Sequence, residues 1–304
     1  MYYLPDLDFE TNFKNLQTRF PQIANDIQFD RLIPDTIDSF YHQLDEKAKD
    51  FDNDGRGKSY REAQIDFMVR HVGIEKLFDL VAPNNQAKDL TSNHKIIDIL
   101  GGNGVLAKCF NKLFPNNNLT ILTSDISASM IQDALANGLL AFRQPAHKIF
   151  TYDNVFDGSI IAYGMHHLDD PIRCCRESWR ILKYGGKIVI HDFEIGSNVD
   201  KWFREIVDKY SITRHNFRHF TKADFTKFLT EAGFHSVTVD KIFDPFCSKD
   251  LASHVQKMYG LKLTKDEVWD LINRYFGTYK LNNEAAVQKY FIMPRFALVG
   301  VGTK

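Results

Sequence analysis

Neither sign of charge prevails in this sequence. It has 38 lysine and arginine residues against 39 aspartate and glutamate residues, which gives a formal net charge of −1 over 304 residues. Proteins that bind nucleic acid through its phosphates usually carry a clear basic excess. Long apolar runs are also lacking, and none approaches the roughly 20 residues of a membrane-spanning helix. We therefore expect neither a nucleic-acid partner nor a membrane partner.

Cysteine is scarce as well. The four cysteines, Cys109, Cys174, Cys175 and Cys247, match no zinc-binding spacing, and adjacent cysteines such as Cys174 and Cys175 rarely form a disulfide with each other. The first residues, MYYLPDLDFETNF, are acidic and polar, unlike a signal peptide with its basic start and apolar core. These features predict a reducing, cytoplasmic setting and no bound metal.

A strand, a glycine turn and a helix are predicted in that order at residues 95–114. Residues 95–104, KIIDILGGNG, contain an apolar β-branched run, an aspartate near its end and a turn with three glycines. The following residues, VLAKCFNKLF, have apolar side chains at helical spacing. Glycines suit a sharp turn that a ligand approaches closely, and the start of the helix offers unpaired N–H groups there. The pattern predicts a ligand site at this turn.

A second buried strand, residues 119–125, ends in Asp125, which lies 125 − 104 = 21 residues after Gly104. Nucleotide-binding strand–helix–strand units place a carboxylate on a ribose diol at this interval. Further strands are predicted at 156–163 and 187–191, and alternating strands at 235–242 and 296–301 could pair at the last edge of the sheet. Strands that alternate with helices predict a doubly wound α/β sheet with its ligand at the carboxyl ends of the strands.

Helical segments precede and interrupt this core. Residues 34–49 and 59–82 have apolar residues at helical spacing, and Gly73 is expected to mark a kink or a break in the second segment. Another helical segment, at about 249–280, contains a capping box formed by Thr264 and Glu267. We therefore predict a helical amino-terminal cover or lid at 1–90 and a main domain at 91–304, with a helical insertion at about 244–289.

Six segments in this order resemble a class I S-adenosylmethionine-dependent methyltransferase of the small-molecule type related to the quinone-biosynthesis enzymes. They are KIIDILGGNG, ILTSDIS, FDGSIIAYGMHHLDDP, LKYGGKIVIHDFE, HFTKADFTKFLTEAGF and FALVGVGTK, and they cover about residues 95–243 and 290–304. The resemblance implies a Rossmann-like, mostly parallel, seven-stranded sheet and S-adenosylmethionine as the cofactor. It implies methyl transfer to an O, N or C atom of a small molecule, which we expect to belong to specialised metabolism.

The resemblance also implies where the cofactor lies. Asp98 and the glycine loop are expected to line its methionine part and ribose, and Asp125 to bind the ribose hydroxyls. The family usually has glycine at the position of Leu100, and an aspartate near Pro145 for the adenine amino group. Proline leaves a backbone carbonyl or the Gln144 side chain for that contact. The expected cofactor-binding residues are Asp98, Gly101, Gly102, Gly104, Asp125, Ile126 and Gln144.

Residues 163–167, after the fourth strand, are expected to face the sulfonium and the acceptor. Methyl transfer needs a base only where the acceptor loses a proton, and an imidazole titrates near neutral pH. The catalytic candidates are His167, His166 and Tyr163. A paired histidine at this place could equally serve packing, by capping the next helix or bonding the backbone.

Two further groups are candidates for the acceptor site. One follows the fifth strand, and the other is a basic cluster interleaved with phenylalanine. Basic residues would suit an anionic acceptor, and a solvated turn or helix end is the structural alternative. The expected substrate-binding residues are His191, Asp192, Glu194, Arg214, His215 and Arg218.

Three alternatives stay open at this point. Residues 102–107 satisfy the G-x-G-x-x-A pattern of nicotinamide dehydrogenases, although a lone match is weak. Leu100 and Pro145 motivate a methyltransferase-like fold that catalyses cyclisation or another rearrangement. The same departures would suit a non-catalytic binding subunit that has lost the cofactor. The sequence also leaves a homodimer open, and it does not identify the acceptor.

Overall fold

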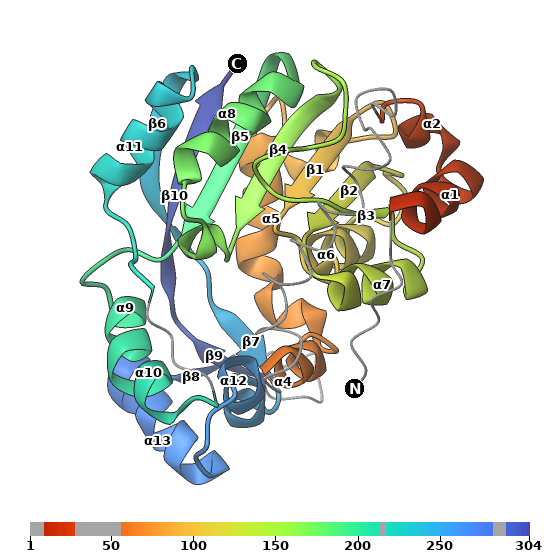
Figure 1. Cartoon of the computed structure of the whole chain (residues 1–304). Helices are drawn as coiled ribbons and strands as arrows, with labels where there is room; N and C mark the ends of the chain where they lie inside the picture. Colours follow the sequence, from red (N-terminus) through yellow and green to blue (C-terminus); the bar gives the residue numbers. More distant parts are fainter. Residues whose placement is uncertain (1–8, 28–55, 213–216, 282–289) are drawn as a thin grey trace.

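A seven-stranded sheet forms the centre of the molecule in the computed structural model, which describes residues 9–27, 56–212, 217–281 and 290–304 (Figure 1). Its strand order is β3-β2-β1-β4-β5-β10-β6. The first five of these strands pair in parallel, and β10 is antiparallel to both β5 and β6. This confirms the predicted doubly wound, mostly parallel sheet. The strands are β1 (Lys95–Ile99), β2 (Thr120–Asp125), β3 (Ala141–Arg143), β4 (Phe156–Ala162), β5 (Leu182–Asp192), β6 (His235–Phe243) and β10 (Phe296–Thr303).

Helices cover both faces of the sheet because its central strands are apolar on both sides. In β1, Ile97 and Ile99 belong to one buried cluster, and Ile96 between them belongs to the other. That alternation follows from the two-residue period of a strand. One face packs against α5 (His71–Val81), α6 (Val105–Leu113) and α7 (Ala128–Ala136). The other packs against α1 (Phe9–Arg19), α8 (Pro171–Ile181) and α11 (Lys222–Glu231).

A third buried cluster lies beyond the carboxyl ends of the parallel strands, in the lower part of Figure 1. The capping box of Thr264 and Glu267 predicted for this region is present. No helix in the described part of the chain is long and apolar enough to cross a membrane. The elements of this region are α4 (Arg56–Ala63), α9 (Asn198–Trp202), η5 (Phe203–Val207), α10 (Asp208–Tyr210), α12 (Leu251–Tyr259), α13 (Lys265–Phe276), and a small sheet of β7 (Phe246–Ser248), β9 (Tyr290–Met293) and β8 (Tyr279–Leu281).

The amino-terminal segment differs from its prediction in detail. The continuous helical spacing at 59–82 is broken between α4 and η2 (Phe67–Arg70), so Ile65 lies in the break and is 78% exposed. Gly73 does not break α5. A Cβ atom there would lie 2.0 Å from the Asp244 carboxylate, so glycine gives this carboxylate room. The predicted helix at 34–49 lies outside the described residues, and the domain boundary at residue 90 stays a prediction.

The edge strand β3 is covered by a side chain of α1. The Asn12 amide donates from Nδ2 to the Ala141 carbonyl oxygen (3.1 Å), and its Oδ1 accepts from the Arg143 N–H (2.7 Å). These are the two bonds that another strand would make with the edge. Asn12 therefore blocks further strand pairing there while α1 packs on the sheet.

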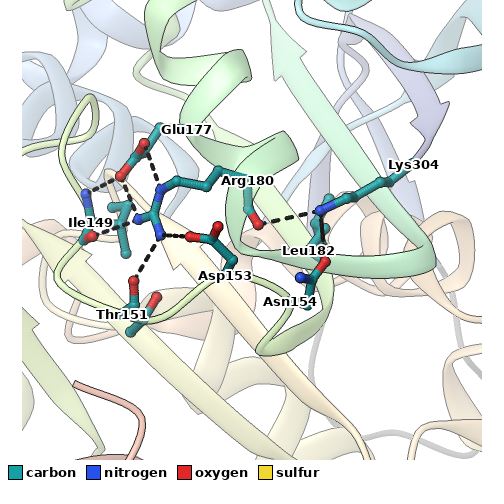
Figure 2. A network of polar contacts seen from close by, with 8 residues as sticks. All are labelled: Ile149, Thr151, Asp153, Asn154, Glu177, Arg180, Leu182 and Lys304. Carbon is teal, nitrogen blue, oxygen red and sulfur yellow. Dashed lines mark hydrogen bonds and ion pairs between the residues drawn. The ribbon is translucent and has the colours of Figure 1, made fainter. Parts of the chain in front are cut away.

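Arg180 ties α8 to the loop that follows β3, as Figure 2 shows. Its guanidinium donates to the Glu177 carboxylate and to Asp153 Oδ1. It also donates to the carbonyl oxygens of Ile149 and Thr151, each at 2.8 Å. Lys304 joins the same network through the carbonyl oxygens of Arg180 and Leu182. The contacts lie at the amino ends of β4 and β5, away from the predicted ligand site.

We expect Arg180→Met to lower the free energy of unfolding by about 2–3 kcal/mol, because it removes the guanidinium that donates to two loop carbonyls and to the Glu177 carboxylate, which then keeps its bond from the Ile149 N–H. Urea unfolding measures the change. Arg176→Met is the matched control on the same helix, since Arg176 makes one long contact of 3.4 Å to the Glu231 carbonyl oxygen. The control should stay within about 0.5 kcal/mol of wild type. Equal losses in both variants would contradict the role given to Arg180.

Candidate functional site

The glycine turn joins β1 to α6 at the carboxyl edge of the sheet. Gly104 is the N-cap of α6 and has a φ of +78°, a conformation that side chains rarely adopt. The Gly102 N–H donates to Asp125 Oδ2 (2.9 Å), which ties the turn to the end of β2. The neighbouring strand ends, β1 and β2, thus form one rigid edge around the turn.

Leu100 occupies a backbone conformation that explains why glycine would suit its position. Its φ is +62°, in the left-handed region, where a leucine costs about 1–2 kcal/mol. The side chain is partly buried and packs on the core cluster that contains Ile97 and Ile99. Leucine therefore keeps the shape of the turn that a glycine would give.

Asp98 is a buried carboxylate with no hydrogen-bond partner among the described residues. It is 1% exposed, and both Oδ1 and Oδ2 lack a donor. Burial raises the pKa of Asp98 well above its usual value, and the negative charge of Asp125 adds to the shift. Such a group is unfavourable unless a cation or a strong donor reaches it. Asp98 can therefore hold a ligand ammonium group.

Asp125, Ile126 and Gln144 are brought together at the end of β2. Asp125 Oδ1 accepts from the Ser127 N–H (2.9 Å), and the Gln144 N–H donates to the Asp125 carbonyl oxygen (3.0 Å). The Gln144 side chain is fully buried. Its Oε1 accepts from the Phe150 N–H (2.8 Å), while Nε2 has no partner within the described ranges. The amide can therefore offer a ligand a donor rather than the acceptor that an adenine amino group needs.

A pocket at this edge is lined by three parts of the chain. The glycine turn, Asp98 and the start of α6 form one side, and Tyr163 and Ala162 come from the end of β4. Tyr60 and Arg70 reach the same pocket from α4 and η2 in the amino-terminal segment. The described residues therefore place amino-terminal side chains directly at the predicted cofactor turn.

Tyr163 belongs to a buried polar network behind the pocket. Its hydroxyl donates to Asp244 Oδ1 (2.9 Å), and Arg295 Nη2 donates to Asp244 Oδ2 (2.8 Å). Burial, followed by the charge of Asp244, raises the pKa of Tyr163 well above its usual value, so the phenol stays protonated. The His191 ring packs on Tyr163 with centroids 4.3 Å apart, and its Nε2 lies 3.6 Å from Asp244 Oδ2. His191 is thus an internal residue of this network.

Two histidine–carboxylate pairs lie beyond the ends of β4 and β5. His166 Nδ1 is 2.8 Å from Asp192 Oδ1, and His219 Nδ1 is 2.8 Å from Asp200 Oδ1. The two imidazole rings are 5.9 Å apart and both contact Phe193 and Phe203. We call these four rings, together with the exposed rings of His167 and Phe217, the aromatic cluster.

The carboxylates fix the chemistry of both imidazoles. Burial alone would raise the pKa of Asp192, but the charge and hydrogen bond of His166 and two backbone N–H groups lower it overall. Burial lowers the pKa of His219, opposed by its bond to Asp200, so this imidazole is neutral at physiological pH. A neutral imidazole that donates from Nδ1 has Nε2 as its basic nitrogen.

The other predicted acceptor residues are dispersed. Glu194 binds Lys241 (2.6 Å), and the exposed Arg218 lies 3.4 Å from Asp224. Arg214 and His215 lie outside the described residues. The basic cluster predicted here is therefore partly neutralised, and His219, which belongs to the same stretch of sequence, is buried against Asp200 instead.

Four residues of this region were missed in the sequence: Arg70, Asp200, Asp244 and Arg295. Arg70 had a weak signal, since it is a lone cation inside the apolar run FMVRHV. Asp200, Asp244 and Arg295 had none. Their partners are far away in the sequence, and no local spacing connects Tyr163 with Asp244 or Asp200 with His219.

Part of this chain is similar in sequence to known proteins. Residues 97–190 match the family model of a methyltransferase domain. The ubiquinone/menaquinone biosynthesis C-methyltransferase UbiE of Cellvibrio japonicus is 34% identical over 116 residues, which are 36% of this chain and 46% of that protein. The UbiE protein of Hahella chejuensis is 32% identical over 45% of this chain and 57% of its own length. The chain thus spans about half the length of these curated relatives.

Solved structures show the same fold. A SAM-dependent methyltransferase of Thermotoga maritima has a TM-score of 0.51 and 16% identity, over 86% of this chain and 99% of that one. A methyltransferase of Haloferax volcanii, solved with the Trm112 methyltransferase activator, has a TM-score of 0.55 and 16% identity, over 84% and 96%. At this identity the likeness concerns the fold alone. Together with the matching domain, it confirms the resemblance to class I S-adenosylmethionine-dependent methyltransferases.

Proposed function

We propose that this chain, which carries a methyltransferase domain in a class I S-adenosylmethionine-dependent fold, transfers a methyl group from S-adenosylmethionine to a ring carbon of a hydroxylated aromatic small molecule. The observation that supports S-adenosylmethionine as the methyl donor is Asp98, a buried carboxylate at the glycine turn that receives no hydrogen bond from the described residues. The names of the matching relatives motivate the acceptor. A role in specialised metabolism stays a prediction.

The residues at the turn fit this donor group by group. Asp98 would hold the ammonium of the methionine part, and Asp125 would accept from the ribose hydroxyls while it keeps its bonds to the backbone. Ile126 would flank the adenine, and the Gln144 Nε2 would donate to a ring nitrogen. When bound, S-adenosylmethionine supplies a methyl group on a sulfonium centre, activated for in-line displacement.

The aromatic cluster fits a planar aromatic acceptor. Phe193 and Phe203 are buried beside two imidazoles at the carboxyl ends of β4 and β5. The exposed rings of His167 and Phe217 lie against the His166 ring. A ring hydroxyl that loses its proton pushes electron density onto the neighbouring ring carbons. The acceptor that suits the cluster therefore carries hydroxyl groups, as a quinol does.

We assign the general base to His166. It follows Tyr163 by three residues, at the end of the strand that lines the pocket, and Asp192 fixes its ring through Nδ1. In this assignment His166 takes the hydroxyl proton at Nε2, and Asp192 stabilises the imidazolium that forms. After methyl transfer the ring carbon loses its hydrogen as a proton while the ring oxygen regains one, which restores the aromatic ring, so one proton is released for each methyl group added. His219 would bind a second polar group of the acceptor. Tyr163, whose phenol donates to Asp244, would form a wall of the site.

The test is methyl transfer to demethylated naphthoquinol, with catechol as a second acceptor, followed by mass spectrometry for the gain of one methylene unit. His166→Gln should lower kcat by about 100-fold or more, because a general base contributes on the order of 10²–10⁴. His167→Gln should lie within about threefold of wild type, because that ring is exposed. S-adenosylhomocysteine affinity should be unchanged in both variants.

Three results would contradict the proposal. An equal loss of kcat in both variants would show that His166 is not the general base. A product methylated on oxygen would show that the methyl group is not transferred to carbon. A product without an added methyl group, formed with consumption of the donor, would favour the non-methylating alternative raised by Leu100 and Pro145.

A further inference from the structure

Arg70 is a buried guanidinium whose donors are largely unused. The residue is 6% exposed, and its Nη2 donates to the weak acceptor Met258 Sδ (3.1 Å). Its Nε has no hydrogen-bond partner in the described segments. The guanidinium carbon lies 4.3 Å from the centroid of the Tyr163 ring and 5.3 Å from that of Phe246. Two aromatic rings thus hold the cation in place without satisfying its N–H groups.

Among the described residues, the charges around Arg70 do not balance. Asp244 acts on Arg70 electrostatically, but its carboxylate oxygens already receive Arg295 Nη2 (2.8 Å) and the Tyr163 hydroxyl (2.9 Å). Two buried guanidinium groups therefore share one carboxylate. A buried cation that lacks an anion of its own is strongly unfavourable in a protein interior. The missing negative charge is one that a ligand can bring.

Arg70 lines the same pocket as Asp98, whose carboxylate oxygens receive no hydrogen bond from the described residues. One wall of the pocket presents a cation with free donors, and another presents a carboxylate with free acceptors. A small pocket with both features matches a zwitterion, that is, an ammonium and a carboxylate on one carbon. The α-amino acid end of the proposed methyl donor is such a group.

We propose that Arg70 binds the α-carboxylate of the donor's methionine part while Asp98 binds its ammonium. This rests on the proposed donor and adds a residue outside the matching methyltransferase domain, which begins at residue 97. The planar guanidinium can give two parallel N–H bonds to a carboxylate, and the Tyr163 and Phe246 rings hold it ready for that contact. The segment that contains η2 thereby completes the donor site.

The experiment compares two ligands that differ by one group. S-adenosylhomocysteine and its decarboxylated analogue, which keeps the amine and lacks the carboxylate, are titrated calorimetrically into wild type and Arg70→Gln. Wild type should prefer S-adenosylhomocysteine by about 100-fold, the size of a buried charge-assisted contact. Arg70→Gln should lose most of this preference because its affinity for S-adenosylhomocysteine falls, while the analogue binds within about threefold of wild type.

Two variants secure the interpretation. Arg70→Lys keeps the positive charge but loses the two parallel N–H donors of the guanidinium. It should retain part of the preference for S-adenosylhomocysteine over the decarboxylated analogue. Arg61→Gln is the matched control, because Arg61 lies nearby on α4 but donates to Ser129 Oγ (2.8 Å) on α7. It should keep the full preference. Thermal unfolding of each variant shows whether it is folded at the temperature of the titration.

Distinct results would overturn the proposal. If Arg70→Gln weakens both ligands equally, Arg70 is a structural residue. If the preference survives in Arg70→Gln, another group binds the carboxylate. If wild type binds both ligands equally well, the proposed donor stands and the assignment to Arg70 fails. If wild type binds neither ligand, the proposed donor fails together with this inference.

Discussion

Asp98→Asn is expected to make the protein more stable at neutral pH while it weakens binding of S-adenosylhomocysteine by about 100-fold. The two effects have one cause. The carboxylate is buried and receives no hydrogen bond from the part of the chain that the structure describes, so ionising it is unfavourable in the folded protein. The same carboxylate is the proposed partner of the ligand ammonium. Urea unfolding and calorimetric titration measure the two quantities.

The pH dependence of this stability gain has a definite sign. The folded protein holds the Asp98 proton more tightly than the unfolded chain does, because burial and then Asp125 raise the pKa. Stability from this group is therefore fully present below the ordinary aspartate pKa of about 3.9 and is lost as pH rises through the folded pKa. The advantage of Asp98→Asn should be larger at pH 8 than at pH 5. A ligand ammonium favours the ionised carboxylate, so ligand binding should become tighter as pH rises toward the folded pKa of Asp98.

Asp192→Asn is the contrasting control. Asp192 is equally buried, but its pKa is lowered, and it accepts from His166 and from two backbone N–H groups. This variant should lose stability. If both substitutions shift stability in the same direction, or if Asp98→Asn binds S-adenosylhomocysteine as wild type does, the role given to Asp98 is wrong.

Asp244→Asn is expected to lower the free energy of unfolding by about 3–5 kcal/mol. Asp244 is 1% exposed and receives Arg295 through Nη2 as well as the Tyr163 hydroxyl. The substitution removes the negative charge that balances the buried guanidinium groups of Arg295 and Arg70, and two buried cations are then left without their shared carboxylate. Asp240→Asn on the adjoining strand β6 is the control. Its carboxylate is 82% exposed in an ion pair with Lys222, and the change should be within about 0.5 kcal/mol. Comparable losses at the two positions would contradict the account of the network.

Gly73 provides an independent check on the same network. Gly73→Ala places a Cβ atom against Asp244 Oδ1 and should cost about 1–3 kcal/mol. In an Asp244→Ala background most of that cost should vanish, because the clashing carboxylate is gone. A double-mutant cycle measures this coupling. Additive losses would show that the carboxylate does not set the need for glycine at this position.

The sequence predicted the sheet and the glycine turn because both depend on local sequence patterns. The apolar run of β1, the glycine turn and the interval to Asp125 depend on neighbours within about 30 residues, and the structure places Asp98, Asp125 and Gln144 at one edge. The matching methyltransferase domain supports the resemblance, and the observed seven-stranded, mostly parallel sheet is the one that the resemblance implies. What the local pattern could not give was the raised pKa of Asp98, which is caused mainly by burial in the folded protein.

The acceptor side was harder to predict for a physical reason. Its polar groups act through contacts between distant segments, such as Tyr163 with Asp244 and His166 with Asp192. His219 looked like one member of an exposed basic stretch, yet it is buried because Asp200 on α9 accepts from its ring. His191 looked like an acceptor contact, yet its ring lies within the Tyr163 network. Spacing along a chain carries no information about such pairs.

The most direct test of the account is a calorimetric titration of the wild-type protein with S-adenosylhomocysteine, with NAD⁺ as the competing candidate for the glycine turn. The account predicts one site per chain with a dissociation constant in the micromolar range, typical of a well-fitted cofactor site, and no binding of NAD⁺. Binding of NAD⁺ with no binding of S-adenosylhomocysteine at millimolar concentration would contradict it. The match to a methyltransferase domain would then describe the fold and not the activity. The carboxylate of Asp98 would need a partner other than the ammonium of S-adenosylmethionine.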